Sequence, residues 1–253
     1  MLRSGALSIT FRKFSCEEFI DIVRKAGLQT IEWGGDVHVP PGDLARASRI
    51  GSLTRQAGLE VAAYGSYYRT ESLAAAESDF PAILDTAREL GAPLIRVWAG
   101  TLGSADLTAE GREELVKHSR LLADMAAQKG MVVASEYHNG TVTDTPESAA
   151  RFLEEVDHPN YRTLWQPHNG APYETALASL RQVLPRLANL HVFHWWPDAA
   201  HRLPLAEGRD RWQGYLEVAA ASGRDHDCLL EFVRNDDPAQ FLEDARTLRE
   251  LLA

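Results

Sequence analysis

Side chains that can ligate a metal ion stand at the ends of four apolar segments in the second half of this 253-residue chain. Two are carboxylates, one is an imidazole and one is a carboxamide. A buried carboxylate is costly unless it is paired or coordinated, and two that face each other repel unless a cation lies between them. These types predict a site for one divalent ion with mixed oxygen and nitrogen ligands, Mn²⁺, Mg²⁺, Co²⁺ or Zn²⁺. The residues are Glu136 in MVVASEY, Gln166 after YRTLW, His191 in NLHVFHW and Glu231 in CLLEFV.

Arginine partners are the alternative for the two glutamates. Arg96 lies in the apolar segment LIRVW, and Arg234 follows Glu231 by three residues. Either guanidinium could form an ion pair with a carboxylate at a strand end. Two carboxylates that flank an imidazole on successive strand ends favour the metal. A site that has lost its metal and binds only a sugar is the other outcome left open.

The elements that must position these residues repeat along the chain. Five helix-like segments end in a glycine that leads into an apolar strand, and glycine just past a helix accepts the positive φ of a helix end without strain. Helix starts carry the complementary signals, a capping box at Ser15 with Glu18 and proline at the first helical position in Thr145-Pro146 and Asp237-Pro238. The eight predicted strands are 7–11, 29–33, 59–64, 94–98, 131–137, 161–165, 189–195 and 228–233.

Apolar strands that alternate with helices are typical of a parallel sheet that is buried on both faces. Eight such repeats in residues 1–253 predict one domain with the (β/α)8 TIM-barrel fold. The rival, a doubly wound sheet, would place a glycine-rich turn after its first strand, and TFRKFSCEEF has no glycine. Active sites of TIM barrels lie at the carboxyl ends of the strands, where the four candidate ligands would be neighbours.

Aromatic and imidazole side chains gather at the same strand ends. Aromatic faces beside polar groups suit a ligand with both C–H faces and hydroxyls, such as a sugar or polyol, although a large ring can also simply plug the mouth of a barrel. His194 lies nearer the open rim than His191, and its ordinary pKa of about 6.5 suits a general base. The aromatic and imidazole residues predicted to bind substrate are Trp33, Trp98, Trp196, His38, His138 and His168.

Charge and composition narrow the class of partner. A formal charge of −10, with no run of lysine and arginine, disfavours a nucleic acid. Cys16 and Cys228 cannot form a disulfide framework, which favours a reducing compartment. The sequence shows no signal peptide and no run of membrane-spanning length, so we expect a cytoplasmic protein with no membrane partner. Exposed barrel helices are compatible with a homodimer.

The chain resembles the xylose-isomerase-like TIM barrels, a superfamily of sugar isomerases and epimerases that also contains inosose dehydratases, dehydroshikimate dehydratases and endonuclease IV. The resemblance covers essentially the whole chain and is most specific in IEWGGDVH, IRVWAG, ASEYHNGTVTD, LWQPHNG, LHVFHWW and LLEFV. It implies that Glu, Asp, His and Glu on strands five to eight hold the metal, and that the two glutamates act as acid and base. By position these are Glu136, Gln166, His191 and Glu231, and the resemblance places His38, Arg96 and Asn169 near the substrate.

The chain departs from the family at Gln166, where the family has an anionic aspartate. An amide oxygen still ligates a hard cation but adds no charge. The change predicts weaker metal binding and a stronger Lewis acid, and it predicts that Gln166→Asp tightens metal binding.

Together these features predict an isomerase or epimerase that acts on a sugar or keto-sugar through a metal-stabilised enediolate. Glu136 and Glu231 are the predicted acid and base, and His194 is a less favoured candidate for the same role. A dehydratase or lyase on a keto-polyol is the alternative, and a metal-free sugar-binding barrel is the alternative of another class. The endonuclease branch is disfavoured because AAYGSYYRT, at the end of strand three, has no histidine.

Overall fold

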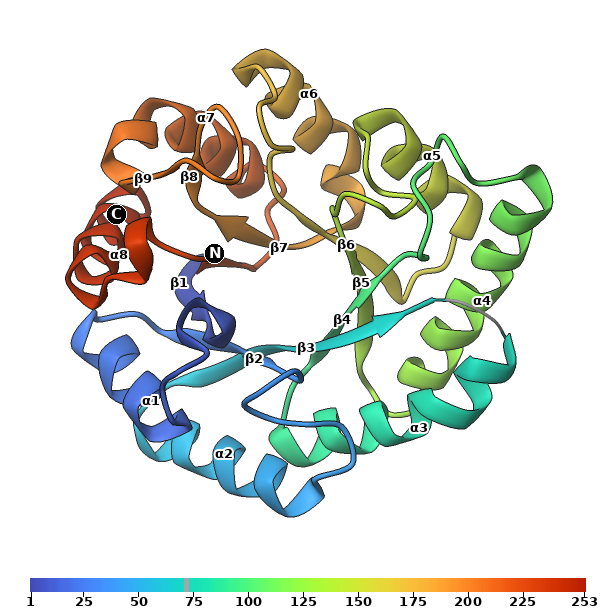
Figure 1. Ribbon diagram of the computed structural model, residues 1–253, viewed down its shortest axis with the longest axis horizontal. Coiled ribbons are helices and arrows are strands. Elements are labelled where there is room, and N and C mark those ends of the chain that lie inside the picture. Colours follow the sequence, from blue (N-terminus) through green and yellow to red (C-terminus); the bar gives the residue numbers. More distant parts are fainter. Residues whose placement is uncertain (71–72) are drawn as a thin grey trace.

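The computed structural model describes residues 1–70 and 73–253 and arranges the long strands in one closed barrel (Figure 1). Neighbouring strands are parallel all the way round, in the order β1-β10-β7-β6-β5-β4-β3-β2. The predicted (β/α)8 fold is therefore confirmed. The barrel strands are β1 Leu2–Leu7, β2 Thr30–Gly34, β3 Glu60–Arg69, β4 Leu94–Trp98, β5 Val132–Glu136, β6 Tyr161–Trp165, β7 Leu187–Val192 and β10 His226–Leu230.

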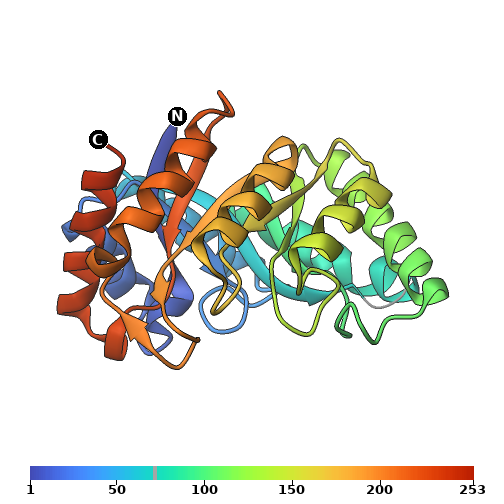
Figure 2. The same ribbon diagram turned by 90° about the horizontal axis from the view of Figure 1, so that it is seen from above.

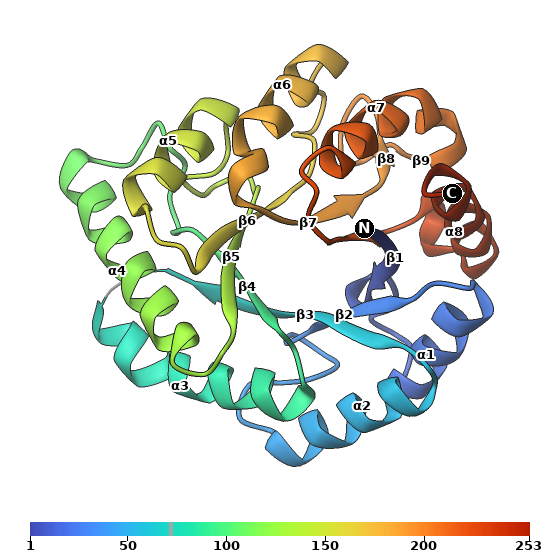
Figure 3. The same cartoon turned by 180° about the vertical axis from the view of Figure 1, so that it is seen from behind.

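Helices surround the barrel and lie between consecutive strands, as Figures 1 and 3 show from opposite sides. The five predicted glycine ends are confirmed, since each glycine has a positive φ of 68–82°. Ser15 and Glu18 form the predicted capping box, and Thr145 and Asp237 cap helices that begin with proline. The helices are α1 Cys16–Lys25, α2 Leu44–Gln56, α3 Leu73–Leu90, α4 Ala109–Ala127, α5 Pro146–Val156, α6 Tyr173–Val183, α7 Arg209–Ala220 and α8 Pro238–Leu251.

The predicted first strand, 7–11, is wrong. Strand β1 comes earlier, and Ser8–Phe11 is a buried 3-10 turn. The sequence LRSGAL looks too polar for a barrel strand, but Arg3 is neutralised by Asp227 at 2.9 Å. Gly5 lets β2 approach closely, because a Cβ there would lie 2.2 Å from the hydroxyl of Thr30.

The predicted seventh strand is too long. Strand β7 ends at Val192, and β8 (His194–Trp195) pairs instead with β9 (Arg202–Leu203) in a separate antiparallel hairpin. Figure 2 shows this hairpin, in orange, at the end of the barrel opposite the two chain termini. His194 therefore lies in this hairpin, beyond the end of β7 and outside the barrel wall.

The barrel interior below the strand ends is filled by small and branched side chains. Because side chains on a strand alternate between faces, Ala134 and Glu136 share the inward face of β5, and Leu164 and Gln166 share that of β6. The apolar layer thus closes the barrel directly beneath the polar ends. The layer consists of Ala63, Leu94, Ala134, Leu164 and Ala188.

Among the described residues, no helix is long and apolar enough to cross a membrane.

Candidate metal centre and active site

Three of the four predicted metal ligands converge at the carboxyl ends of β5, β7 and β10. One ligand atom from each of Glu136, His191 and Glu231 lies within 4.8 Å of the others, and all three side chains are buried. The Nδ1 atom of His191 is 3.3 Å from Glu136 Oε1 and 3.7 Å from Glu231 Oε2. The arrangement presents two carboxylates and one imidazole nitrogen to a common point.

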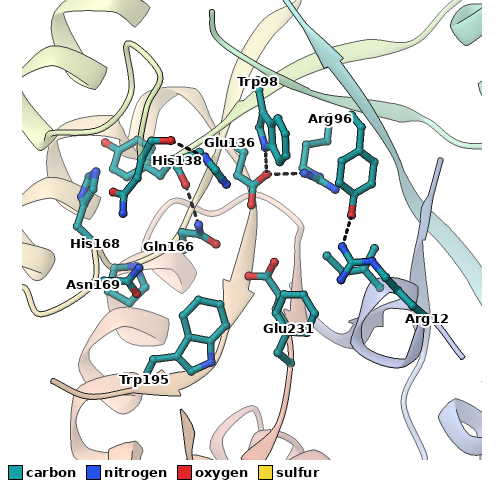
Figure 4. Close-up of a pocket in the computed structure, with 16 residues that line it drawn as sticks. Arg12, Arg96, Trp98, Glu136, His138, Gln166, His168, Asn169, Trp195 and Glu231 are labelled. Atoms are coloured by element: carbon teal, nitrogen blue, oxygen red, sulfur yellow. Dashed lines mark hydrogen bonds and ion pairs between the residues drawn. The ribbon is translucent and has the colours of Figure 1, made fainter. Parts of the chain in front are cut away.

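Gln166 lies just past β6 and reaches the same cavity. Its Nε2 donates a hydrogen bond of 2.7 Å to the main-chain oxygen of Tyr137, which fixes the orientation of the amide. The amide oxygen is thereby turned toward Glu136 and Glu231 (Figure 4). The hydrogen bond explains how a neutral side chain can hold an oxygen in the position of a ligand.

The unsatisfied atoms at this point fit a divalent ion. Gln166 Oε1, His191 Nδ1 and Glu231 Oε2 are each buried, and in the described part of the chain none has a hydrogen-bond partner. Buried polar atoms of this kind are rare because each carries a desolvation cost. Two oxygens and an imidazole nitrogen, with Glu136 beside them, form a donor set that suits Mg²⁺, Mn²⁺, Co²⁺ or Zn²⁺.

Arg96 forms a buried bridge between two glutamates, the predicted Glu136 and Glu32, which was not predicted as a site residue. Its side chain is 2% exposed, its Nε donates to Glu32 Oε1 at 2.6 Å, and its Nη1 donates to Glu136. The predicted alternative, an arginine partner for a glutamate, is therefore confirmed for Arg96 and Glu136. The same glutamate also belongs to the cluster of possible metal ligands. Arg234 makes no such pair with Glu231 and instead donates to Gln240 at 2.7 Å. Glu32 could have been found by the criterion applied to Glu136, a charged residue inside an apolar strand.

The two candidate acid–base residues have opposite electrostatic environments. Burial raises the pKa of Glu136, but Arg96 and His191 outweigh it and bring the pKa well below its usual range. Trp98 Nε1 adds a 2.7 Å hydrogen bond to the same carboxylate oxygen that Arg96 holds. Burial raises the pKa of Glu231, and the nearby charge of His191 does not reverse that shift. Glu136 is thus held ionised, whereas Glu231 is the carboxylate that takes a proton more readily.

The ligand cluster opens into a cavity of about 260 Å³. Eight of the residues predicted for the site line it, from Arg96 on β4 to Glu231 after β10 (Figure 4). Tyr67 and Phe232 also line it and have positive φ values of 59° and 44°, a strained backbone that clusters at functional sites. The predicted residues in the wall are Arg96, Trp98, Glu136, His138, Gln166, His168, Asn169 and Glu231; the others are Ile9, Arg12, Tyr67, Tyr137, Asn139, Pro167, Trp195 and Phe232.

Five predicted site residues do not line this cavity, and one of them, His191, is fully buried among the ligand atoms. Trp33 is fully buried and donates from Nε1 to Thr54 at 3.1 Å, and His38 packs edge-on against Trp33. Both rings fill space between the barrel and its helices, so they have a packing role and do not face the cavity. His194 and Trp196 line a smaller neighbouring hollow, because β7 ends before them.

Comparison with known proteins places the chain in a family. A family model described as xylose isomerase-like TIM barrel matches residues 20–251. A curated relative, the 3-dehydroshikimate dehydratase of Bacillus anthracis, is 44% identical over 68 residues, which make up 27% of this chain and only 24% of that protein.

Solved structures share the fold over nearly the whole chain. A probable 3-DHS dehydratase from Bacillus anthracis, involved in petrobactin synthesis, is 23% identical, with a TM-score of 0.78 and 98% of both chains covered. A D-psicose 3-epimerase from Clostridium cellulolyticum H10 with D-tagatose is 15% identical, with a TM-score of 0.71 over 99% of this chain and 98% of that one. A xylose isomerase-like barrel from Mycobacterium smegmatis in complex with magnesium is 18% identical, with a TM-score of 0.69 over 99% and 98%. The chain belongs to the xylose isomerase-like TIM barrel family.

Proposed function

We propose that this protein is a divalent-metal-dependent dehydratase, which removes a proton beside a carbonyl of a small hydroxylated substrate and eliminates water. The convergence of Glu136, His191, Glu231 and the oriented oxygen of Gln166 carries the proposal. A divalent ion held by these four residues would polarise the substrate carbonyl and make the neighbouring C–H bond more acidic. The related barrel that was solved in complex with magnesium supports a metal of this kind.

The difference between the two glutamates favours elimination over epimerisation. Epimerisation at carbon needs one group to remove a proton and a second to return it on the opposite face. Glu136 is a poor second group, because Arg96 and Trp98 both donate to the same oxygen of its carboxylate. No hydrogen-bond donor among the described residues contacts the carboxylate of Glu231, and burial raises its pKa, so one oxygen can act as the base while Oε2 faces the metal site. One carboxylate without donors beside one anion held by two donors suits a reaction in which the enzyme removes a single proton from carbon.

Each residue then has a defined part in the reaction. Glu231 takes the proton from the carbon beside the carbonyl, and the electron pair of that C–H bond forms a carbon–carbon double bond. The hydroxyl on the next carbon leaves with a proton as water. His138 lines the same cavity, and its Nδ1 donates to the main-chain oxygen of Asn139. In its imidazolium form it would supply that proton from Nε2 and be left as the neutral ring. Glu136 stays ionised and holds its place against Arg96 and Trp98.

The cavity wall supports a small substrate with an anionic group. Trp98, Tyr67 and Trp195 offer aromatic faces, and Arg12 adds a partly exposed guanidinium at the rim. Arg12 already pairs with Asp36 through Nε and contacts the hydroxyl of Tyr67, which orients its remaining N–H groups. The local match to a 3-dehydroshikimate dehydratase makes that cyclic hydroxy-ketone carboxylate the first substrate to test.

Incubation of the Mn²⁺-loaded protein with 3-dehydroshikimate tests the proposal. We expect elimination to give a ring dienone that becomes an aromatic dihydroxybenzoate when a proton leaves its remaining CH₂ group and the carbonyl oxygen gains one, followed by absorbance and NMR. The rate should fall about 10²–10⁴-fold in Glu231→Gln, the usual contribution of a general base. Asp227→Asn, which removes a buried carboxylate at the other end of the barrel, is the matched control and should retain the rate. Turnover that survives in Glu231→Gln would refute the assigned role.

Epimerisation of a ketose is the second candidate function, because both glutamates line one cavity and a D-psicose 3-epimerase shares the fold. Incubation with D-fructose and D-psicose in D₂O separates the two functions. Conversion between the two ketoses with deuterium at the reacting carbon would favour the epimerase. The proposed dehydratase predicts no such interconversion.

A further inference from the structure

We infer that Glu32 is a positioning residue that fixes the ring of His191, so that Nε2–H points to Glu32 and Nδ1 remains free for the metal. The inference rests on the proposed metal site and adds to it a residue outside the four ligands. Glu32 comes from β2, across the barrel from β7, and is 1% exposed. Its Oε2 lies 3.4 Å from His191 Nε2, on the side of the ring away from Glu136 and Glu231.

The two ring nitrogens of His191 have distinct environments. Nδ1 faces Glu136 and Glu231 and has no hydrogen-bond partner in the described part of the chain, whereas Nε2 contacts Glu32. A histidine that ligates a metal through one nitrogen commonly donates its other N–H to a carboxylate, which sets both the tautomer and the ring orientation. Glu32 supplies that carboxylate.

Glu32 is itself held in place from the other side. Arg96 Nε donates to its Oε1 at 2.6 Å, so one oxygen serves the arginine and the other serves the histidine. Gly65 on β3 makes room for this pair, since a Cβ there would lie 2.8 Å from Glu32 Oε1 and 2.6 Å from Arg96 Nη2. The strand backbone therefore passes directly beside the ion pair.

The charges separate the role of Glu32 from that of the metal ligands. Arg96 neutralises one of the three buried carboxylates, so Glu136 and Glu231 together match the charge of a divalent ion. Glu32 therefore adds no net charge to the site beyond its ion pair. Its effect on metal binding would act through the direction in which His191 points.

Glu32→Gln gives a sharp consequence, because an amide has one acceptor oxygen where the carboxylate has two. The oxygen is needed by the Arg96 guanidinium, and the amide N–H₂ is then left facing His191 Nε2. Two donors would oppose each other, so the ring loses the acceptor that orients it. We expect Mn²⁺ affinity to fall about 10–100-fold, the usual effect of removing such a partner.

Two measurements test the inference. Mn²⁺ binding by electron paramagnetic resonance compares the wild type, Glu32→Gln and the control Asp227→Asn, which loses a buried carboxylate paired with Arg3 far from the site. NMR of the wild type, metal-free and Mg²⁺-loaded, should show a slowly exchanging His191 Nε2–H, identified by its absence in His191→Gln. The second measurement needs no folded variant at Glu32.

The outcomes distinguish the inference from the proposed function. Weakened Mn²⁺ binding in Glu32→Gln but not in Asp227→Asn, with the proton on Nε2 in the wild type, supports the inference. Unchanged Mn²⁺ affinity in a folded Glu32→Gln, or a wild-type Mg²⁺ form with the proton on Nδ1, overturns it. Failure of the wild type to bind Mn²⁺ refutes the metal site itself.

Discussion

Replacing Arg96 with methionine would show how strongly the buried carboxylates depend on their common partner. Methionine keeps most of the length of the side chain but removes the charge and the donors. Breaking a buried ion pair by removing one partner costs about 3–5 kcal/mol, because it leaves an uncompensated charge. Arg96 serves both Glu32 and Glu136, so we expect the free energy of unfolding at pH 8 to fall by at least about 4 kcal/mol. That is a large share of an ordinary stability of about 5–15 kcal/mol.

The loss should depend on pH with a definite sign. In the wild type, Arg96 helps to outweigh burial and lowers the pKa of Glu32 and of Glu136, so each contributes stability above its unfolded pKa that is lost as the pH falls. Without Arg96, burial raises the pKa values, and the carboxylates can be accommodated by protonation. The difference in stability between wild type and Arg96→Met should therefore be largest at neutral and alkaline pH and should shrink in acid.

Urea unfolding followed by tryptophan fluorescence, with and without Mn²⁺, measures these effects. A metal at a hundred times its Kd would restore about 2.7 kcal/mol, because it binds the folded state alone. Arg3→Met, which breaks a partly exposed pair with Asp227, is the control. It should lose less stability, and because its metal site is intact it should gain as much from Mn²⁺ as the wild type does. A loss below about 1 kcal/mol in Arg96→Met, typical of an exposed pair, would refute the assignment of a buried electrostatic bridge.

Three further predictions concern residues around this network. Gln166→Asp should tighten Mn²⁺ binding about tenfold or more, because ligand charge tunes affinity over decades; unchanged or weaker binding by calorimetry would show that Gln166 is no ligand. Burial raises the pKa of Asp244 to about 6, so the stability that its protonated form contributes is lost as the pH rises through that value. In Asp244→Asn the free energy of unfolding, measured with urea, should therefore vary by about 3 kcal/mol less between pH 4 and 7. A pH profile that matches the wild type would contradict that assignment. His194→Gln should change turnover less than tenfold, short of the 10²–10⁴-fold expected of a base, and a larger loss in steady-state kinetics would restore it as a catalytic residue.

The barrel could be predicted because its signals are local. Each glycine after a helix and each N-cap depends on a few neighbouring residues, and the structure retains them. The first strand was missed because its polar residues are compensated from distant parts of the chain, Arg3 by Asp227 and the close approach at Gly5 by Thr30. Such compensation depends on contacts that no local pattern contains.

The site also combines features that local patterns predict with features that depend on contacts between distant residues. Period-two alternation and the order of strands were enough to bring Glu136, His191 and Glu231 together. The bridge from Glu32 through Arg96 spans three strands, and the sequence offers no spacing that pairs one strand-two glutamate with one strand-four arginine. His194 was misplaced for a related reason, because it lies past the end of β7 and pairs with Leu203 of β9 beyond the barrel.

The neutral side chain of Gln166 is consistent with the rest of the charge distribution. Glu32, Glu136, Glu231 and Arg96 carry a formal charge of −2 together, so a divalent ion would bring the cluster to zero when His191 is neutral. An aspartate at 166 would leave one negative charge in a buried cavity, which would raise the pKa of Glu231 further and weaken the pull on a substrate carbonyl. Gln166, held by the carbonyl of Tyr137, supplies an oxygen without that charge. With a metal bound as proposed, glutamine at this position would favour strong polarisation of the substrate over tight retention of the metal.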